Sequence, residues 1–396
     1  MTGTRVLDLG QLGFDRGAHI LVQRELLRLA RGEALAVRGA ADGLAAHLRA
    51  WARAMGHEFE AAPGLAGVVR AGPAAAARWR GAERAGSAAA DGAVAAAPLH
   101  WGLAARGALV EAGMPAFAFA LAQKDEVWAD DPGALYRQAA AAQWDPETAI
   151  PWAAAAASSG DGEDALVQVL TYLIENETAA ALVPARFCAQ THPHYREVLQ
   201  LLAIQAADEA RHIEVFTRRA ALRRTELGTS TVGGQASLKT LVDEPDFALA
   251  SFLLSVLGEG SFLHLLGFLH VHAPDPCTAE IMRLAAQDES RHVAFGMAHL
   301  QRHGARDATL RSRLALAIER RHDALRHTAG LDQNVFDALV VLAARGFAPE
   351  AIAGGHAAVA ELVQQMDAGR RARLRKLGFE GAEAAALSAL HTRNFM

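Results

Sequence analysis

The feature that most constrains this chain is a five-residue motif that occurs twice, 80 positions apart. The copies are DEARH at 208–212 and DESRH at 288–292, and each contains Glu-x-x-His. Because positions i and i+3 lie on one face of an α-helix, the carboxylate and the imidazole of a copy can bind the same metal ion. Both copies follow apolar helical stretches, LQLLAIQAA and IMRLAAQ. A carboxylate on such an inward face is costly unless a cation or a partner compensates it.

Each copy of the motif has a glutamate upstream at a similar distance. Glu177 lies 32 residues before the glutamate of the first copy, and Glu259 lies 30 residues before that of the second. The midpoints of the two intervals are Pro193 and Pro274, so each interval predicts a helical hairpin that turns at a proline. Two such hairpins bring together four carboxylates and two imidazoles, the ligand set of a two-metal site in a bundle core. The predicted ligands are Glu177, Glu209, His212, Glu259, Glu289 and His292, and the four glutamates are also the candidate catalytic residues.

The first ligand has an alternative. Glu175 and Glu177 both occur in IENETAAA, and residues two apart on a helix point roughly 200° away from each other, so only one can face the site. We favour Glu177 and keep Glu175 as the alternative. Some two-metal bundles add a histidine from another helix, but for His322 and His327, five positions apart, a solvated face is the favoured interpretation.

The residues beside each Glu-x-x-His are expected to orient the histidines. A metal-bound histidine usually donates its other ring N–H to a carboxylate. Antiparallel packing of the hairpins would set the aspartate of each copy against the histidine of the other copy. The arginine of each copy could then pair with these buried aspartates. The residues concerned are Asp208, Asp288, Arg211 and Arg291.

The rest of the chain predicts a mainly α protein, preceded by a small α/β domain. The 396 residues, 52% of them hydrophobic, can form one large or two ordinary cores. Residues 1–71 alternate strand and helix patterns and end in EFEAA and LAGVVRA, a third strand or a hairpin. Residues 72–97 are an Ala/Gly-rich linker, and residues 98–396 are helical nearly throughout. The helix breakers fall near Pro132, Pro151, Pro184, Pro193, Pro245, Pro274, Pro276 and Pro349.

Charge and composition exclude several classes of partner. A net charge of −5 and a pI near 6.4 argue against a general binder of nucleic acid or anionic membranes. We expect no membrane span, because no uncharged apolar run reaches about 18 residues. The two cysteines, Cys188 and Cys277, form no CxxC motif, and no signal peptide is recognised. We therefore expect a protein of the reducing cytoplasm.

At the motif residues the chain resembles the ferritin-like di-iron oxygenases. The closest likeness is to the hydroxylase α-subunits of bacterial multicomponent monooxygenases. The doubled Asp-Glu-x-Arg-His of that family stands here as DEARH and DESRH, its first Glu motif as 176–180 (NETAA), and its second as 258–262 (GEGSF). The resemblance covers roughly residues 140–300 and implies a ferritin-like four-helix bundle with extra helices. It also implies two iron ions and the use of O2 as co-substrate.

The resemblance has one departure close to the site. Those hydroxylases place a threonine that lines the oxygen pocket where Leu263 stands here. Hydroxylation of methane or toluene is therefore disfavoured, and a stand-alone oxygenase such as an amine N-oxygenase is the kind of relative that remains. Phe262 and Leu263 are expected to line the pocket of a small organic substrate.

The N-terminal 71 residues resemble the small sulfur-carrier family typified by TusA and SirA. The stretches LDLGQLGFDRGAHILVQRELLRLARGEALAV and AWARAMGHEFE follow the pattern of that family. Its active Cys-Pro is absent, because Phe14-Asp15 stands in that place. A carrier without the thiol cannot hold a persulfide, so the resemblance implies a docking or structural module.

The favoured function is that of a non-haem di-iron oxygenase that hydroxylates, N-oxidises or desaturates an organic substrate. Its electrons would come from a reductase or a ferredoxin, and a homodimer is compatible with the sequence. The alternative is a ferroxidase or other iron-handling protein, or a protein similar to manganese catalase. The ligands suit Mn/Fe as well as Fe/Fe. Neither the substrate, the oligomeric state nor the role of the N-terminal domain follows from the sequence.

Overall fold

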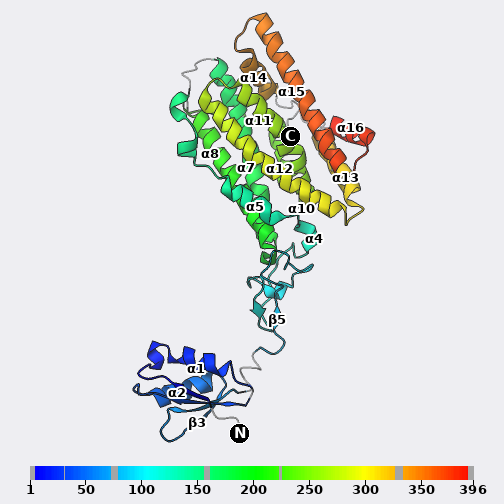
Figure 1. The fold of residues 1–396 in the computed structure, drawn as a ribbon. Coiled ribbons are helices and arrows are strands. Elements are labelled where there is room, and N and C mark those ends of the chain that lie inside the picture. The colour runs from blue at the N-terminus through cyan, green and yellow to red at the C-terminus, as the bar shows by residue number, and fades with distance from the viewer. Residues whose placement is uncertain are drawn as a thin grey trace. The chain divides into compact units, whose positions relative to one another are not determined.

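The computed structural model describes residues 5–30, 32–72, 79–155, 161–222, 225–325 and 333–390. The chain forms two compact units. The first contains Met1–Ser87 and Gly107–Pro115, and the second contains Ala88–Arg106 and Ala116–Met396. Helices dominate the second unit (Figure 1), as the predicted mainly α fold class requires.

The first unit contains a four-stranded sheet with two helices. Strand β1 is parallel to β2, whereas β4 is antiparallel to both β2 and β3, which gives the order β1-β2-β4-β3. The last two segments of the predicted domain therefore form a hairpin. The elements are β1 (Arg5–Asp8), η1 (Phe14–Arg16), α1 (Ala18–Leu26), β2 (Ala34–Arg38), α2 (Leu44–Ala54), β3 (Glu58–Glu60) and β4 (Gly67–Arg70).

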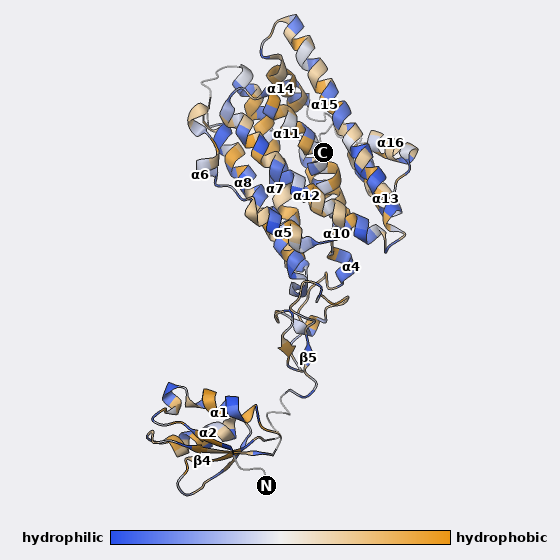
Figure 2. Cartoon of the chain, in the orientation of Figure 1, coloured by the Kyte–Doolittle hydropathy of each residue, from blue (hydrophilic) through white to orange (hydrophobic). Residues whose placement is uncertain are grey.

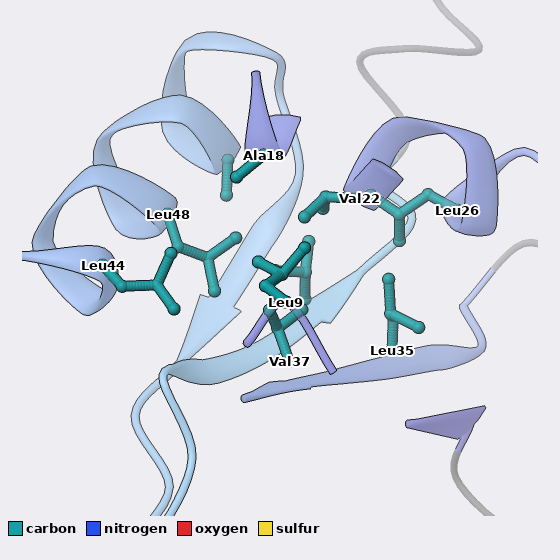
Figure 3. Close-up of a cluster of buried hydrophobic side chains, with 10 residues drawn as sticks. Leu9, Ala18, Val22, Leu26, Leu35, Val37, Leu44 and Leu48 are labelled. Atoms are coloured by element: carbon teal, nitrogen blue, oxygen red, sulfur yellow. The ribbon is translucent and has the colours of Figure 1, made fainter. Parts of the chain in front are cut away.

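The core of this unit lies between the sheet and its two helices. Side chains four positions apart on α1 and α2, and two positions apart on β2, point toward one another (Figure 3). These are the periods of an amphipathic helix and of a strand with one buried face. The two-layer α/β arrangement is thus the one that the strand and helix patterns predict. The residues labelled in Figure 3 are Leu9, Ala18, Val22, Leu26, Leu35, Val37, Leu44 and Leu48.

The segment that the sequence assigns to a linker, 72–97, is divided between the two units. Residues 73–78 lie outside the described part of the chain. Beyond them, β5 (Glu83–Arg84) pairs antiparallel with β6 (Leu109–Val110). Residues 88–97 belong to the helical unit, where the hydroxyl of Tyr195 lies within hydrogen-bond distance of two carbonyl oxygens, Ala95 O at 3.1 Å and Ala122 O at 2.8 Å.

The second unit consists of two long helical hairpins with further helices around them. Its elements before the hairpins are η2 (Leu99–Trp101), α4 (Lys124–Val127), α5 (Pro132–Ala141), α6 (Pro146–Ala149) and η3 (Trp152–Ala154). The hairpins and the helices between them are α7 (Asp161–Gln190), η4 (Pro193–Tyr195), α8 (Arg196–Ala220), α9 (Val232–Val242), α10 (Phe247–Ser251), η5 (Phe252–Glu259), α11 (Gly260–His272) and α12 (Pro276–Gly304). The last helices are α13 (Leu310–Leu325), α14 (Gln333–Ala344), α15 (Pro349–Lys376) and α16 (Gly381–Ala389).

The two hairpins turn where the prolines predict. The chain turns between α7 and α8 at Pro193, and between α11 and α12 in the three residues before Pro276. Pro276 and Pro349 occupy the first turn of their helices, where the missing N–H costs nothing. Pro184 differs from the prediction, because α7 continues through it. A breaker inside so long a helix is tolerated when tertiary packing holds the helix on both sides, and Val183 and Phe187 on either side of Pro184 are buried.

The third long arm of the bundle is not a uniform α-helix. It runs from α10 through η5 to α11, and η5 is an eight-residue π-helix. The stretch Phe247–His272 is long and apolar enough to cross a membrane, but 78% of its most apolar window is buried inside the protein. The core helix of a bundle passes the same test, so this finding is weak evidence for a span.

The remaining helices cover the outside of the two hairpins. α14 packs on α7, and α15 packs on both α14 and α11. Hydrophilic residues are spread along α8, α13 and α15 in Figure 2, as expected for helices with one face toward solvent. The four arms thus enclose a core that the sequence predicts to hold the ligands.

Candidate metal centre

All six predicted ligands lie buried in the middle of the bundle. Glu177 is on α7, Glu209 and His212 are on α8, and Glu289 and His292 are on α12. The sixth, on the third arm, is the last residue of the π-helix η5. None of the six is more than 4% exposed.

The six side chains form two groups that share two members. In each group the ligand atoms lie within 4.8 Å of one another. Glu209 and Glu289 belong to both groups. The two groups are Glu177, Glu209, His212 and Glu289, and Glu209, Glu259, Glu289 and His292. We call them the His212 half-site and the His292 half-site.

The two shared carboxylates are each turned so that one oxygen faces each histidine. Glu209 has Oε2 at 3.1 Å from His212 Nδ1 and Oε1 at 3.0 Å from His292 Nδ1. Glu289 has Oε1 at 3.4 Å from His212 Nδ1 and Oε2 at 3.5 Å from His292 Nδ1. This is the disposition of carboxylates that can bridge two ions.

In each of the two histidines, the ring nitrogen Nε2 points away from the cluster and contacts an aspartate of the other hairpin. His212 Nε2 lies 3.2 Å from Asp288 Oδ2, and His292 Nε2 lies 3.2 Å from Asp208 Oδ2. Each pairing is the one expected from the sequence. The aspartate fixes the ring orientation and leaves Nδ1 free to face the carboxylates.

The two arginines of the motifs bind the same aspartates. Arg211 donates to Asp208 at 2.6 Å and to Asp288 at 2.8 Å. Arg291 pairs with Asp288 and lies 3.7 Å from Asp208. The two positive charges thus compensate two buried negative charges outside the ligand set.

Two further residues join this network and carry no signal in the sequence. Gln143 Nε2 donates to Asp208 at 2.8 Å, and Trp144 Nε1 donates to Asp288 at 2.8 Å. Both follow α5, about 65 and 144 residues away from their partners. Arg211 also stacks over the Trp144 ring, 4.6 Å from its centroid. No spacing rule links such a loop to the motif, so only the fold could reveal it.

Gln205 contacts a ligand directly and also lacks a sequence signal. It is 4% exposed and lies on α8 one turn before Glu209. Its Nε2 donates a hydrogen bond of 2.8 Å to Glu259 Oε1. A glutamine among the apolar residues of LQLLAIQAA could have been noticed, but its partner on another hairpin could not.

The electrostatics of the cluster depend on burial and on crowding. Burial raises the pKa of Glu177 well above its ordinary value, and the charges of Glu209 and Glu289 raise it further. Burial also raises the pKa of Glu259, and the charge of Glu289 adds to this effect. For Glu209, burial works in the same direction, but the nearby imidazoles outweigh it and lower its pKa.

The two histidines show the opposite balance. Burial alone would lower the pKa of His212, but its hydrogen bonds to Asp288 and to the cluster carboxylates raise it well above the ordinary value. For His292 the charge of Glu209 and the hydrogen bond to Asp208 have the same effect. Without a cation, protons provide the positive charge that this cluster requires. Metal binding must therefore displace protons.

The residues fit a pair of divalent ions. Buried polar atoms normally have hydrogen-bond partners. Within the described part of the chain, several atoms of the cluster have none, although metal ligation would satisfy them. Four carboxylates also offset the +4 charge of two divalent ions. The unpartnered atoms are Glu177 Oε1, Glu209 Oε1, Glu259 Oε2, both oxygens of Glu289, and His292 Nδ1.

Other candidate residues lie apart from the cluster. Glu175, the alternative first ligand, is only half-buried and is in neither half-site. His322 lies 3.4 Å from Asp323 on α13, and His327 is outside the described residues. Leu263 lines a cavity of about 320 Å³ between α11 and α15, so it does not share the buried position of Phe262.

Comparison with known proteins gives a structural similarity only. No protein-family model and no curated protein matches the chain. The chain is similar to a solved R2-like ligand-binding oxidase with an aerobically reconstituted Mn/Fe cofactor (TM-score 0.49, 17% identity, 63% of this chain and 93% of that chain covered). A variant of such an oxidase with an aerobically reconstituted Fe/Fe cofactor gives the same TM-score and identity, with 63% and 94% covered.

TM-scores below 0.5 do not identify the nature of the centre, which only the chain's own residues indicate. In each antiparallel hairpin, the first arm supplies one glutamate and the second arm supplies a Glu-x-x-His. That is the arrangement of the ferritin-like two-metal bundles.

Proposed function

We propose that this chain is a non-haem di-iron oxygenase, which uses two iron ions to activate O2 for the oxidation of a small organic substrate. The observation that carries the proposal is the sharing of Glu209 and Glu289 between the two half-sites. A single-metal site needs no shared carboxylates, whereas two ions a few ångströms apart need ligands that bridge them.

The side chains have distinct tasks in this proposal. Glu177 with His212, and Glu259 with His292, would each hold one ion, and the shared glutamates would hold both. The iron pair, when bound, would pass to O2 the electrons that a reductase or a ferredoxin delivers. Imidazole and carboxylate ligands suit iron without making the site soft, and they suit a Mn/Fe pair as well.

The protein around the ligands fixes their orientation and excludes water. The aspartates keep each imidazole turned with Nδ1 toward the cluster. On one side of His212 the indole of Trp144 stacks nearly parallel, with ring centroids 6.5 Å apart, and Phe216 lies 6.2 Å from the same ring. Full burial of the ligands gives the dry surroundings in which charges interact strongly.

Several finer points belong to the same proposal. The oxidation would be a hydroxylation, an N-oxidation or a desaturation, with electrons from a reductase or a ferredoxin. A cytoplasmic location is supported by the two unpaired cysteines. The N-terminal unit would serve as a docking or structural module, because Phe14-Asp15 cannot perform thiol chemistry.

Anaerobic loading with ferrous iron tests the proposal. We expect about two irons per chain and, on admission of oxygen, a transient optical band and no further iron uptake. Storage of tens of irons over repeated oxidation would favour the ferroxidase alternative instead.

A pair of variants on α8 separates the metal site from the helix that carries it. Glu209→Ala removes a shared ligand and should abolish binding of both ions. Glu214→Ala changes an exposed glutamate of the same helix and should bind iron as the wild type does. If the wild type binds no metal, or if Glu209→Ala still binds two ions, the proposal is wrong.

A further inference from the structure

The internal repeat is broken at a position that touches the metal centre. The two motifs are related by an offset of 80 residues, so Gln205 on α8 corresponds to Ala285 on α12. Both residues are buried and lie one turn before the shared glutamate of their own helix. Gln205 carries an amide donor, whereas Ala285 carries none.

The two outer glutamates have correspondingly different surroundings. Glu259 Oε1 accepts the hydrogen bond from Gln205 at 2.8 Å, and Oε2 has no partner within the described residues. Glu177, which occupies the matching place in the other hairpin, receives no amide hydrogen bond from the described residues, and its Oε1 is buried and unpartnered. An amide thus holds one outer carboxylate, whereas within the described residues the other has only the His212 ring near its Oε2, at 3.8 Å.

The two outer glutamates also differ in the type of helix that carries them. Glu177 lies inside the regular helix α7, whereas Glu259 ends the π-helix η5. A π-helix contains more residues per turn than an α-helix and so changes the direction in which its last side chain points. The side chain that it re-aims is the one that Gln205 then holds.

We propose that Gln205 is a positioning residue that fixes the orientation of Glu259 and thereby makes the two half-sites unequal. This inference rests on the proposed two-metal function. The amide occupies one lone-pair position of Oε1 and thereby fixes the rotation in which Glu259 presents its remaining lone pairs to the cluster. Within the described residues no amide orients Glu177 in this way. The His292 half-site is therefore preorganised and binds its ion more tightly than the His212 half-site.

The test is a stepwise metal titration of the full-length protein. Gln205→Met keeps the length of the side chain but removes the donor. Ser261→Ala is the matched control, because it removes a buried hydrogen bond of 2.7 Å to Leu257 O on the same arm, and within the described residues Ser261 forms no hydrogen bond with a candidate ligand. Ferrous iron is added anaerobically in competition with a chromophoric chelator, and the two dissociation constants are determined.

The wild type and the control should bind two ions with distinguishable dissociation constants. In Gln205→Met we expect the tighter ion to lose affinity by roughly 10–100-fold, as is typical when a group that orients a ligand is removed. The weaker ion should keep its affinity. Equal weakening of both ions, or no weakening, would overturn the inference while leaving two-metal binding intact. If the wild type itself binds no iron, the proposed function fails, and this inference fails with it.

A second measurement does not depend on whether the variant folds. In a crystal structure of the iron-loaded wild type, Gln205 Nε2 should remain within hydrogen-bond distance of Glu259 Oε1, and Glu259 should bind only the ion of the His292 half-site. Loss of the Gln205 hydrogen bond in the iron-loaded protein, or a bridge by Glu259 between the two ions, would contradict the inference.

Discussion

A buried arginine at the end of the bundle allows a quantitative test of how the hairpins are held together. Arg219, near the end of α8, is 1% exposed. Its guanidinium binds Glu163 of α7 at 2.7 Å, Asp275 at 2.8 Å and Thr278 of α12 at 2.8 Å. One side chain therefore joins three of the long helices, seven residues beyond His212.

Replacement of Arg219 by methionine should lower the free energy of unfolding by about 3 kcal/mol. Removal of one partner of a buried ion pair costs about 3–5 kcal/mol, because the other charge is left uncompensated. We expect the lower end of this range, because Asp275 Oδ1 still accepts the Thr278 N–H at 2.7 Å. At 2–4 °C per kcal/mol, the thermal midpoint should fall by roughly 6–12 °C.

The assay is denaturation of the metal-free protein followed by far-UV circular dichroism, which reports the helical unit. Arg218→Met is the control at the adjacent position, because Arg218 lies over the Trp152 ring and pairs with Glu147, whose side chain is 67% exposed. It should cost less than about 1 kcal/mol. Adding Glu163→Gln to Arg219→Met should regain about 1 kcal/mol by removing one uncompensated charge. A loss below 1 kcal/mol in Arg219→Met, or no recovery in the double variant, would refute this reasoning.

Three further outcomes are expected. Glu177→Gln should reduce iron binding to one ion or none, whereas Glu175→Gln should keep two; equal stoichiometry in both variants would show that the first ligand is assigned wrongly. Chelation of the metal should lower the thermal midpoint of the wild type, because a ligand that binds only the folded state stabilises it, and an unchanged midpoint would contradict this. Burial lowers the pKa of His299 to about 4. Between about pH 6.5 and pH 4 the unfolded chain therefore binds a proton at His299 that the folded chain does not. The free energy of unfolding should fall by on the order of 3 kcal/mol as the pH is lowered over this range. His299→Asn, which retains a donor for Trp128 O, should lose less over this range in denaturation at pH 7 and pH 4.5, and an equal loss would count against the assignment.

The ligand positions were accessible from the sequence because they follow short-range rules. A Glu-x-x-His places two donors on one helix face whatever surrounds the helix. Two arms of equal length about a proline return the chain to its starting height, which brings Glu177 beside the first motif. The exchange of aspartates between motifs follows from the antiparallel packing of the same hairpins.

The features that escaped prediction depend on contacts between distant segments. Gln143 and Trp144 reach the aspartates from a loop that no periodicity connects to the motifs. The π-helix before Glu259 is a local deviation that the apolar pattern FLLSVLGE does not mark. The continuation of α7 through Pro184 likewise depends on the tertiary packing of neighbours such as Val183 and Phe187, which overrides a local breaker.

The sequence by itself determined that this chain has two hairpins, six inward-facing donors and a separate α/β unit, since each of these depends on spacing along a single element. Only the tertiary structure decided which carboxylates are shared, because sharing depends on how four helices are rotated against one another. It also decided that the two outer glutamates, Glu177 and Glu259, have different hydrogen-bond surroundings. The difference between Gln205 and Ala285 is visible in the sequence. However, Glu259, the hydrogen-bond partner of Gln205, lies on the other hairpin, and only helix packing brings Gln205 and Glu259 together.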